Sequence, residues 1–401
     1  MTTTCSRPTP TRPAPAPAVV GPDLPWPALL VLGGATLTMV TGEMLPTAVL
    51  GPMSRGLGVS DAAGGLLVSA WAAVVVVASF PLVALTRRWR RTTVITGSLA
   101  AFAVASALTA LAPSYGVVVG ARTLGAASVG LLWSTVNAHV ADLVPDRLLG
   151  RATAVVLGGA TLGMVLGTPV GRFVADLAGW RAAFWVLAAA SVVAAVLVRV
   201  VVPEEGHAAG AGAGEQAPGT SLWPMVVVTA LVALALVGHH GAYTFITRLG
   251  EPAADLLPGG VASVLLVFGL ASAVGVVLAG RVTGDTRGGL VIATAGTAAA
   301  ILAVGAAGSA GWPVLAAVVA WGVLSGALPP LAQTLVLRLA GPTHRTMAGA
   351  LIPVLFNGGI AVGAALAAGV VSVGGAGAVA APAAALVGAA AVGMVVLSRP
   401  R

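Results

Sequence analysis

Residues 26–50 read WPALLVLGGATLTMVTGEMLPTAVL, a run whose only charged residue is Glu43. A run of about 20 apolar residues is long enough to cross the hydrocarbon core of a bilayer as an α-helix. A carboxylate inside such a span is costly to bury, so by default it marks a functional site. The stretch therefore predicts a transmembrane helix that carries one functional acidic residue.

The rest of the chain has the same character. Its 401 residues are 58% hydrophobic and 8% charged, whereas a soluble domain carries about 25% charged residues. Runs such as Ala72–Ser79 lack the polar–apolar alternation of a membrane β-strand. We therefore expect an all-α integral membrane protein with about twelve transmembrane helices. They are predicted at residues 27–50, 62–85, 93–111, 116–140, 152–174, 182–202, 224–247, 260–281, 289–308, 313–338, 347–370 and 377–397.

The absence of lysine and the presence of a single cysteine exclude several classes of chemistry. The sequence has no lysine, so it has neither a Walker A loop nor a Schiff-base nucleophile, and we expect no enzyme activity. The lone cysteine, Cys5, excludes disulfides within the chain and cysteine-based zinc sites. No cofactor or metal is expected. The formal charge of +8 is spread over short loops, so nucleic acid is not an expected partner.

The chain divides into two related halves. A proline-rich tail, residues 1–25, is expected to be disordered, and a Gly/Ala-rich linker, residues 203–222, separates bundles at 26–202 and 223–401. An offset of 197 residues carries Trp26 to Trp223, Thr86 to Thr283, Arg90 to Arg287, Gly125 to Gly322 and Pro145 to Pro342. The offset predicts two pseudo-symmetric six-helix halves in parallel, an arrangement found in secondary transporters.

Arginine placement predicts the orientation. If the N-terminus is cytoplasmic, fifteen arginines lie in inner tails and loops and four on the outer side. Inner loops of membrane proteins carry the excess of positive charge. We therefore expect a multi-pass protein of the plasma membrane, the bacterial inner membrane, with both termini and the linker in the cytoplasm.

Several motifs resemble one family. The first helix carries Thr41-Gly42-Glu43-Met44-Leu45, followed by Gly56-Leu57-Gly58-Val59-Ser60, and an arginine-rich loop runs from Pro81 to Arg91. The fourth helix opens with an Arg-x-x-Gly stretch, Arg122 to Gly125, and the fifth holds a Gly/Pro-rich stretch, Gly159 to Gly171. Together they resemble the major facilitator superfamily, and within it the drug/proton antiporter and sugar-efflux (arabinose/chloramphenicol exporter-like) branch.

The resemblance implies roles for these motifs. The loop residues Thr86, Arg87, Arg88, Arg90 and Arg91 occupy the place of a conformational loop whose acidic residue is missing here. The Gly/Pro-rich stretch, with Gly163, Gly167, Pro169 and Gly171, is typical of exporters. An alternative interpretation is that these small residues only let helices approach closely.

Glu43, Arg122 and His240 are the predicted proton-coupling residues. Glu43 and Arg122 lie at the same predicted depth, about 10 Å from the outer ends of their helices, and the resemblance implies that both helices face a central cavity. Protonation of Glu43 would release Arg122; alternatively, the two form a fixed ion pair. His240 is the repeat partner of Glu43 and could relay protons or simply be a buried, hydrogen-bonded histidine. The sequence leaves open whether His239 or His240 faces the cavity.

Helical spacing predicts the remaining cavity lining: Thr36, Thr47, Trp133, Asn137, His239, Tyr243, Trp321 and Ser325. Few charges among apolar and aromatic groups suit an amphiphilic substrate. The leading hypothesis is a monomeric secondary transporter that exports small amphiphilic compounds, drugs or metabolites, by proton antiport with alternating access. The alternatives are an efflux permease for sugars or other polar metabolites, and a non-transporting membrane receptor or scaffold. Expected partners are the small-molecule substrate, protons and the lipid bilayer.

Overall fold

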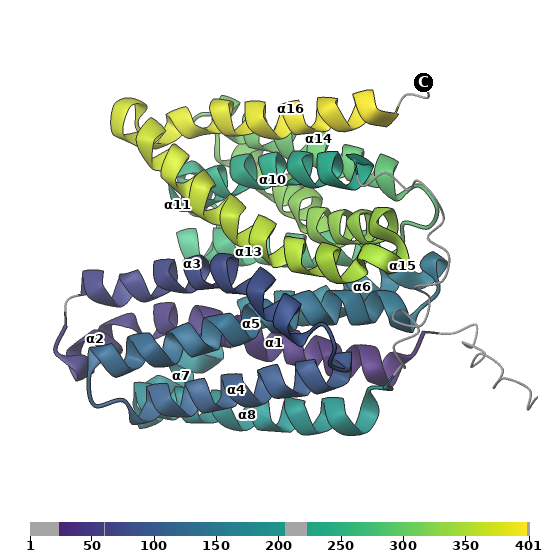
Figure 1. Ribbon diagram of the computed structural model, residues 1–401. Coiled ribbons are helices and arrows are strands. Elements are labelled where there is room, and N and C mark those ends of the chain that lie inside the picture. Colours follow the sequence, from purple (N-terminus) through teal and green to yellow (C-terminus); the bar gives the residue numbers. More distant parts are fainter. Residues whose placement is uncertain (1–23, 60, 205–222, 399–401) are drawn as a thin grey trace, which may run out of the picture.

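The computed structural model describes residues 24–59, 61–204 and 223–398, and its regular elements are all helical (Figure 1). Most of the predicted tail and most of the predicted linker lie outside the described residues. The first half holds α1 (Trp26–Ala48), α2 (Leu50–Leu57), α3 (Asp61–Thr86), α4 (Arg91–Leu111), α5 (Tyr115–Leu143), α6 (Asp146–Leu162), the π-helical turn η1 (Gly163–Gly167), α7 (Thr168–Ala178) and α8 (Trp180–Val201). The second half holds α10 (Trp223–Thr244), α11 (Ile246–Leu249), α12 (Glu251–Ala254), α13 (Val261–Gly280), α14 (Thr286–Ala306), α15 (Gly311–Gly374), the 3₁₀ turn η2 (Ala376–Val379) and α16 (Ala380–Ser398).

Ten of the described helices are long and apolar enough to cross a membrane. One of them, α15, is two helices joined at Gly341, where φ is +59°. A positive φ favours glycine, and the following Pro342 suits the start of a new helix. With α3, whose apolar part is Ala70–Thr86, the described spans account for the twelve that were expected.

The fifth span differs most from its expected bounds. It begins at Asp146 rather than near residue 152, because Pro145 precedes a polar first turn that hydropathy alone places outside the bilayer. The short helices α2, α11 and α12 follow the first and seventh spans and were not predicted. The backbone of α15 keeps helical angles through Pro329-Pro330 and leaves them only at Gly341.

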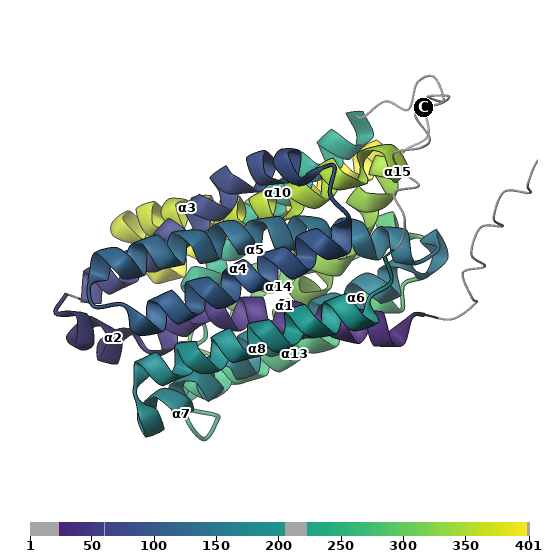
Figure 2. The same cartoon turned by 60° about the horizontal axis from the view of Figure 1, so that its bottom comes forward.

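The helices form two groups that meet along α3, α5, α6, α13 and α15. In Figure 1 most first-half helices, which run from purple to teal, lie below those of the second half, which run from the teal of α10 to yellow, and Figure 2 shows the same bundle from another side. Within the first half, α1 packs against α6 and α8; within the second, α10 packs against α15 and α16. Between the halves, α15 packs against α3 and α5, and α13 packs against α6.

The Gly/Pro-rich stretch is the seam between the fifth span and α1. Gly159, Gly163, Gly167 and Gly171 face Gly33, Leu37, Thr41 and Leu45 in turn, both series advancing four residues at a time. A Cβ at Gly163 would lie 2.6 Å from the carbonyl oxygen of Leu37. Small residues at such spacing let two helix backbones approach closely. Pro169, which cannot donate a backbone hydrogen bond, is the second residue of α7, just beyond the wider π-helical turn.

The outer surface is apolar. On α8, Val192, Val193, Val196 and Val200 are each more than half exposed. A soluble protein seldom exposes such a row, whereas lipid tails solvate it well. The surface therefore agrees with a multi-pass membrane protein.

Candidate functional site

Arg122 on α5 ties three helices of the first half together. It is 5% exposed. Its Nη1 donates to the carbonyl oxygen of Gly42 at 2.7 Å, and its Nη2 donates to that of Glu43 at 3.4 Å. The guanidinium carbon lies 3.9 Å from the ring centre of Trp71 on α3, within reach of a cation–π attraction.

Arg122 binds the carbonyl oxygen of Gly42 for a reason that lies in the sequence of α1. In an α-helix the carbonyl of Gly42 would accept from the backbone N–H of residue 46, but residue 46 is proline and has none. A buried carbonyl without a donor costs free energy. Arg122 supplies the missing donor, so a proline inside α1 creates the binding place for the arginine of α5.

The carboxylate of Glu43 does not bind this arginine, which contacts only the backbone carbonyl of Glu43. The side chain of Glu43 is half-buried, and among the described residues no hydrogen bond or ion pair holds its carboxylate. The expected carboxylate–guanidinium pair is therefore absent from this arrangement of the described helices, because the guanidinium binds the α1 backbone instead. The carboxylate remains free to exchange a proton or to meet a ligand.

A second group of polar and aromatic side chains lies in the other half. His239, His240 and Tyr243 of α10 gather with Phe268 of α13 and Trp321 of α15, with ring centres 4.8–6.0 Å apart. The indole Nε1 of Trp321 donates to Nδ1 of His239 at 3.1 Å. We call these five residues the aromatic cluster.

The hydrogen bond distinguishes the two histidines. An indole N–H only donates, so Nδ1 of His239 is the acceptor and the proton of the neutral ring sits on Nε2. His240 is half-buried, and its Nδ1 is buried with no partner among the described residues. His239 is therefore held by the protein, whereas His240 has an unused ring nitrogen.

A double-mutant cycle tests the His239–Trp321 bond. Each single change, His239→Phe or Trp321→Phe, leaves one buried polar group unpaired and should lower the unfolding free energy by about 1–3 kcal/mol beyond the loss of packing. The double variant removes both polar groups, so its loss should be smaller than the sum. Unfolding free energies of the four proteins in micelles measure the coupling, and strictly additive losses would contradict the bond.

The other predicted lining residues do not form one surface. Thr36 is fully buried and donates to Val156 of α6 at 2.7 Å, so it fastens α1 to the fifth span. Thr47 is exposed.

The lining residues predicted on the fourth and tenth spans do not form one surface either. Trp133 packs against Ala154, Leu157 and Val276 where the halves meet. Asn137 is buried, with its amide nitrogen unpaired among the described residues, and the hydroxyl of Ser325 turns back to Gly322 at 3.3 Å. The structure thus brings together Glu43 with Arg122, and His239, His240, Tyr243 and Trp321, as two separate groups.

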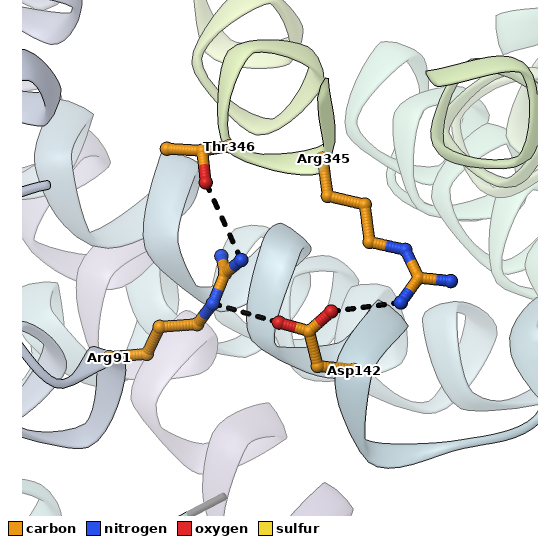
Figure 3. Close-up of polar contacts among 4 residues, drawn as sticks. All are labelled: Arg91, Asp142, Arg345 and Thr346. Carbon is orange, nitrogen blue, oxygen red and sulfur yellow. Dashed lines mark hydrogen bonds and ion pairs between the residues drawn. The ribbon is translucent and has the colours of Figure 1, made fainter. Parts of the chain in front are cut away.

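At one end of the bundle two ion pairs join the halves, and one of their carboxylates, Asp142, also binds a second arginine. Asp142 of α5 forms an ion pair with Nε of Arg91 on α4 at 2.9 Å and accepts a hydrogen bond from Nη1 of Arg345 on α15 at 2.9 Å (Figure 3). Arg91 also donates to the hydroxyl of Thr346 at 3.4 Å. Nearby, Arg338 of α15 donates to Asp146 of α6 at 3.1 Å. We call the end defined by Asp142, Asp146, Arg338 and Arg345 the arginine-rich end.

This arrangement accounts for the missing acidic residue of the 81–91 loop. Of the predicted conformational residues, Arg91 binds Asp142, Arg90 and Arg199 share Glu204, and the Thr86 hydroxyl donates to its own helix. Arg87 and Arg88 are exposed. The acidic partner comes from α5. The sequence contained a signal for this partner, because Asp142 and Asp146 lie on either side of Pro145 in a chain with only 12 acidic residues.

Removing the shared carboxylate should loosen this end. In Asp142→Asn, Arg91 and Arg345 keep their like charges without the anion between them, and a hydrogen bond to a charged group contributes about 1.5–3 kcal/mol. We expect the halves to separate here in a larger fraction of molecules, by about tenfold or more. Spin labels are attached at the exposed positions 88 and 343 in a Cys5→Ser background, and the distance between them is measured by electron paramagnetic resonance. In the Asp142→Asn variant the mean distance should be longer and the distance distribution broader.

The matched control is Asp176→Asn. Asp176 pairs with Arg172 four residues earlier on the same helix and is more than half exposed, so its loss should leave the distance unchanged. Equal broadening in both variants would contradict a role for the Asp142 bridge in closing this end.

No group of three or more His, Cys, Asp or Glu side chains in the described segments is placed to hold a metal ion. The apolar outer surface and the number of membrane-length helices define a multi-pass membrane protein. Residues 31–283 match the Major Facilitator Superfamily, and the chain belongs to this family.

Its relatives and structural neighbours agree with this assignment. The chain is 31% identical over 348 residues, 84% of each chain, to a chloramphenicol efflux pump of Mycobacterium tuberculosis. It is 28% identical over 328 residues, 81% of this chain and 83% of the other, to a probable sugar efflux transporter of Helicobacter pylori. The crystal structure of the human organic anion transporter MFSD10 superimposes with a TM-score of 0.77 at 17% identity, over 93% of this chain and all of that one. The expected family and fold are confirmed.

Proposed function

We propose that this protein exports small amphiphilic compounds, drugs or metabolites, in exchange for protons. The observation that carries the proposal is the state of Glu43, a half-buried carboxylate in a membrane span that no described residue binds. Such a carboxylate can take up and release a proton without first breaking an ion pair. The similarity to an efflux pump for chloramphenicol supports the export direction.

In this proposal Arg122 and His240 assist Glu43. Arg122 keeps a positive charge beside the carboxylate while its hydrogen bonds hold the backbone of α1. Protonation of Glu43 removes one charge of this neighbourhood, which changes how α1 is attracted to α5. His240 offers an unpaired ring nitrogen in the second half, where it can accept a proton or contact substrate.

The aromatic cluster supports an amphiphilic substrate. Tyr243 is 36% exposed while Trp321 is fully buried, so the cluster leaves one aromatic side chain accessible above a buried indole. Aromatic groups bury large areas and pack against planar ligands. We propose that substrate binds between this cluster and the Glu43–Arg122 group, with Tyr243 and His240 as the first contacts.

Alternating access would proceed by opening and closing the arginine-rich end. The Asp142–Arg345 and Asp146–Arg338 pairs hold this end together in the structure, so they must part before substrate can reach the centre from that side. The excess of arginine at this end supports a cytoplasmic location. We propose a monomer in the bacterial inner membrane, with both termini in the cytoplasm and the bundles at 26–202 and 223–401 moving as units.

Efflux of sugars or other polar metabolites is the second candidate. It is favoured by buried polar atoms that lack partners among the described residues, on Asn137, Thr229 and Gln333, and by the similarity to a probable sugar efflux transporter. Such atoms could be satisfied by the hydroxyl groups of a polar ligand.

Transport in inverted membrane vesicles decides between the two. With a proton gradient imposed, chloramphenicol should be taken up by vesicles that contain the protein, with a simultaneous fall in the gradient, and labelled arabinose should not. Uptake of arabinose alone would favour the sugar permease. Chloramphenicol uptake that persists after the gradient is collapsed would contradict proton antiport.

A further inference from the structure

A hollow of about 490 Å³ opens at the arginine-rich end, away from Glu43 and the aromatic cluster. It lies between the start of α6, the connection from α13 to α14, and α15, so both halves form its walls. Its lining residues are Asp146, Arg147, Leu148, Arg151, Thr283, Gly284 and Arg338. Its volume is in the range of small-molecule sites, which is about 300–1,000 Å³.

The charge of this hollow is positive. Arg147 and Arg151 lie four residues apart on α6, hence on the same face of the helix. Both are exposed, and neither makes a hydrogen bond or ion pair with any residue that the structure describes. The only acidic lining residue, Asp146, is already engaged by Arg338. Two uncompensated guanidinium groups therefore face the same space.

The backbone adds to this charge. The helix α6 begins at Asp146, and no side chain caps its first turn. The unpaired N–H groups of a helix start carry a partial positive charge that favours anions. A guanidinium group binds phosphate oxygens in a planar, bidentate way that lysine cannot reproduce.

We propose that this hollow binds a phosphate-bearing anion, either the headgroup of an anionic phospholipid or a soluble phosphate. The anion would lie on Arg147 and Arg151 of the first half and touch the Thr283–Gly284 connection of the second. A ligand that contacts both halves only when they are together favours that arrangement. Its binding would therefore stabilise the closed state of the arginine-rich end.

Thermal unfolding of the purified full chain in neutral detergent micelles tests the site. Phosphatidylglycerol, phosphatidylcholine and inorganic phosphate are titrated separately into wild type, the Arg147→Gln/Arg151→Gln variant and the Arg87→Gln/Arg88→Gln variant. The last variant removes two exposed arginines from the same end but outside the hollow, so it controls for general attraction of anions.

Wild type and the Arg87/Arg88 control should be stabilised by an anion, and the Arg147/Arg151 variant should bind it about tenfold more weakly or worse, since charge-assisted contacts are the strong ones. Stabilisation by phosphatidylglycerol alone would identify a lipid headgroup as the ligand, and stabilisation by inorganic phosphate would identify a soluble one. Equal responses of the two double variants, or no stabilisation of wild type by either anion, would overturn the proposal.

Discussion

Glu43→Gln is expected to abolish proton-driven export while leaving the fold and substrate binding in place. The amide has nearly the shape of the carboxyl group but cannot exchange a proton. No described residue depends on the carboxylate for a hydrogen bond, so its loss should leave no partner unsatisfied. Coupling between two sites in a protein commonly changes the binding affinity at one of them by about 5–150-fold. Without an exchangeable proton at position 43, we expect the effect of a pH gradient on substrate accumulation to disappear.

Two measurements separate this result from simple inactivation. Chloramphenicol uptake by inverted vesicles is compared with and without a pH gradient, and exchange of labelled for unlabelled compound is followed with no gradient. The Gln variant should lose the effect of the pH gradient on uptake and retain the exchange of labelled for unlabelled compound. Glu43→Asp should keep part of the coupling. A Gln variant that still accumulates substrate in response to the gradient would show that another residue carries the proton.

Gly159→Ala is expected to disrupt the packing of α1 against the fifth span. A Cβ at this position would lie 2.8 Å from the Cα of Gly33 and closer still to its carbonyl group. The opposing atoms are backbone, which cannot move aside as a flexible side chain would, so the cost should reach or exceed the upper end of the usual overpacking range of about 1–3 kcal/mol. Any movement of α1 away from the fifth span to make room for the added methyl group would also strain the Thr36–Val156 hydrogen bond between them.

The neighbouring glycine provides the control. A Cβ at Gly158 meets nothing within 4 Å. Because alanine is better than glycine inside a helix, Gly158→Ala should be neutral or stabilise by about 0.5–1 kcal/mol. Thermal unfolding and the yield of monodisperse protein compare the two variants. Similar stability of both would mean that α1 and the fifth span pack less closely than the structure shows.

Much of the fold follows from single segments of the sequence. The spans of α1, α4 and α8 begin and end within two residues of their expected positions. Each span is decided by how one continuous segment partitions between water and lipid, and that depends on its own composition. Elements outside this rule were missed: the polar first turn of α6 and the short α2.

The partners of charged residues were less predictable. The sequence marks Glu43 and Arg122 as costly charges at one depth, but the guanidinium binds the carbonyl left free by Pro46 rather than the carboxylate. Likewise, the sequence shows that the 81–91 loop lacks an acid, and only the packing of α4, α5 and α15 brings Asp142 to Arg91. In both cases several partners were chemically suitable.

The sequence by itself determined that residues 26–50 cross a membrane, that about twelve such spans form two related halves, and that Glu43 is the exceptional charge in the first of them. These are properties of a segment and its solvent. The tertiary structure alone decided that Gly159 meets Gly33, that Trp321 binds His239, and that Asp142 and Asp146 join the two halves. Such pairings depend on which helix faces bury each other, since lipid satisfies any apolar face equally well and only close contact selects among them.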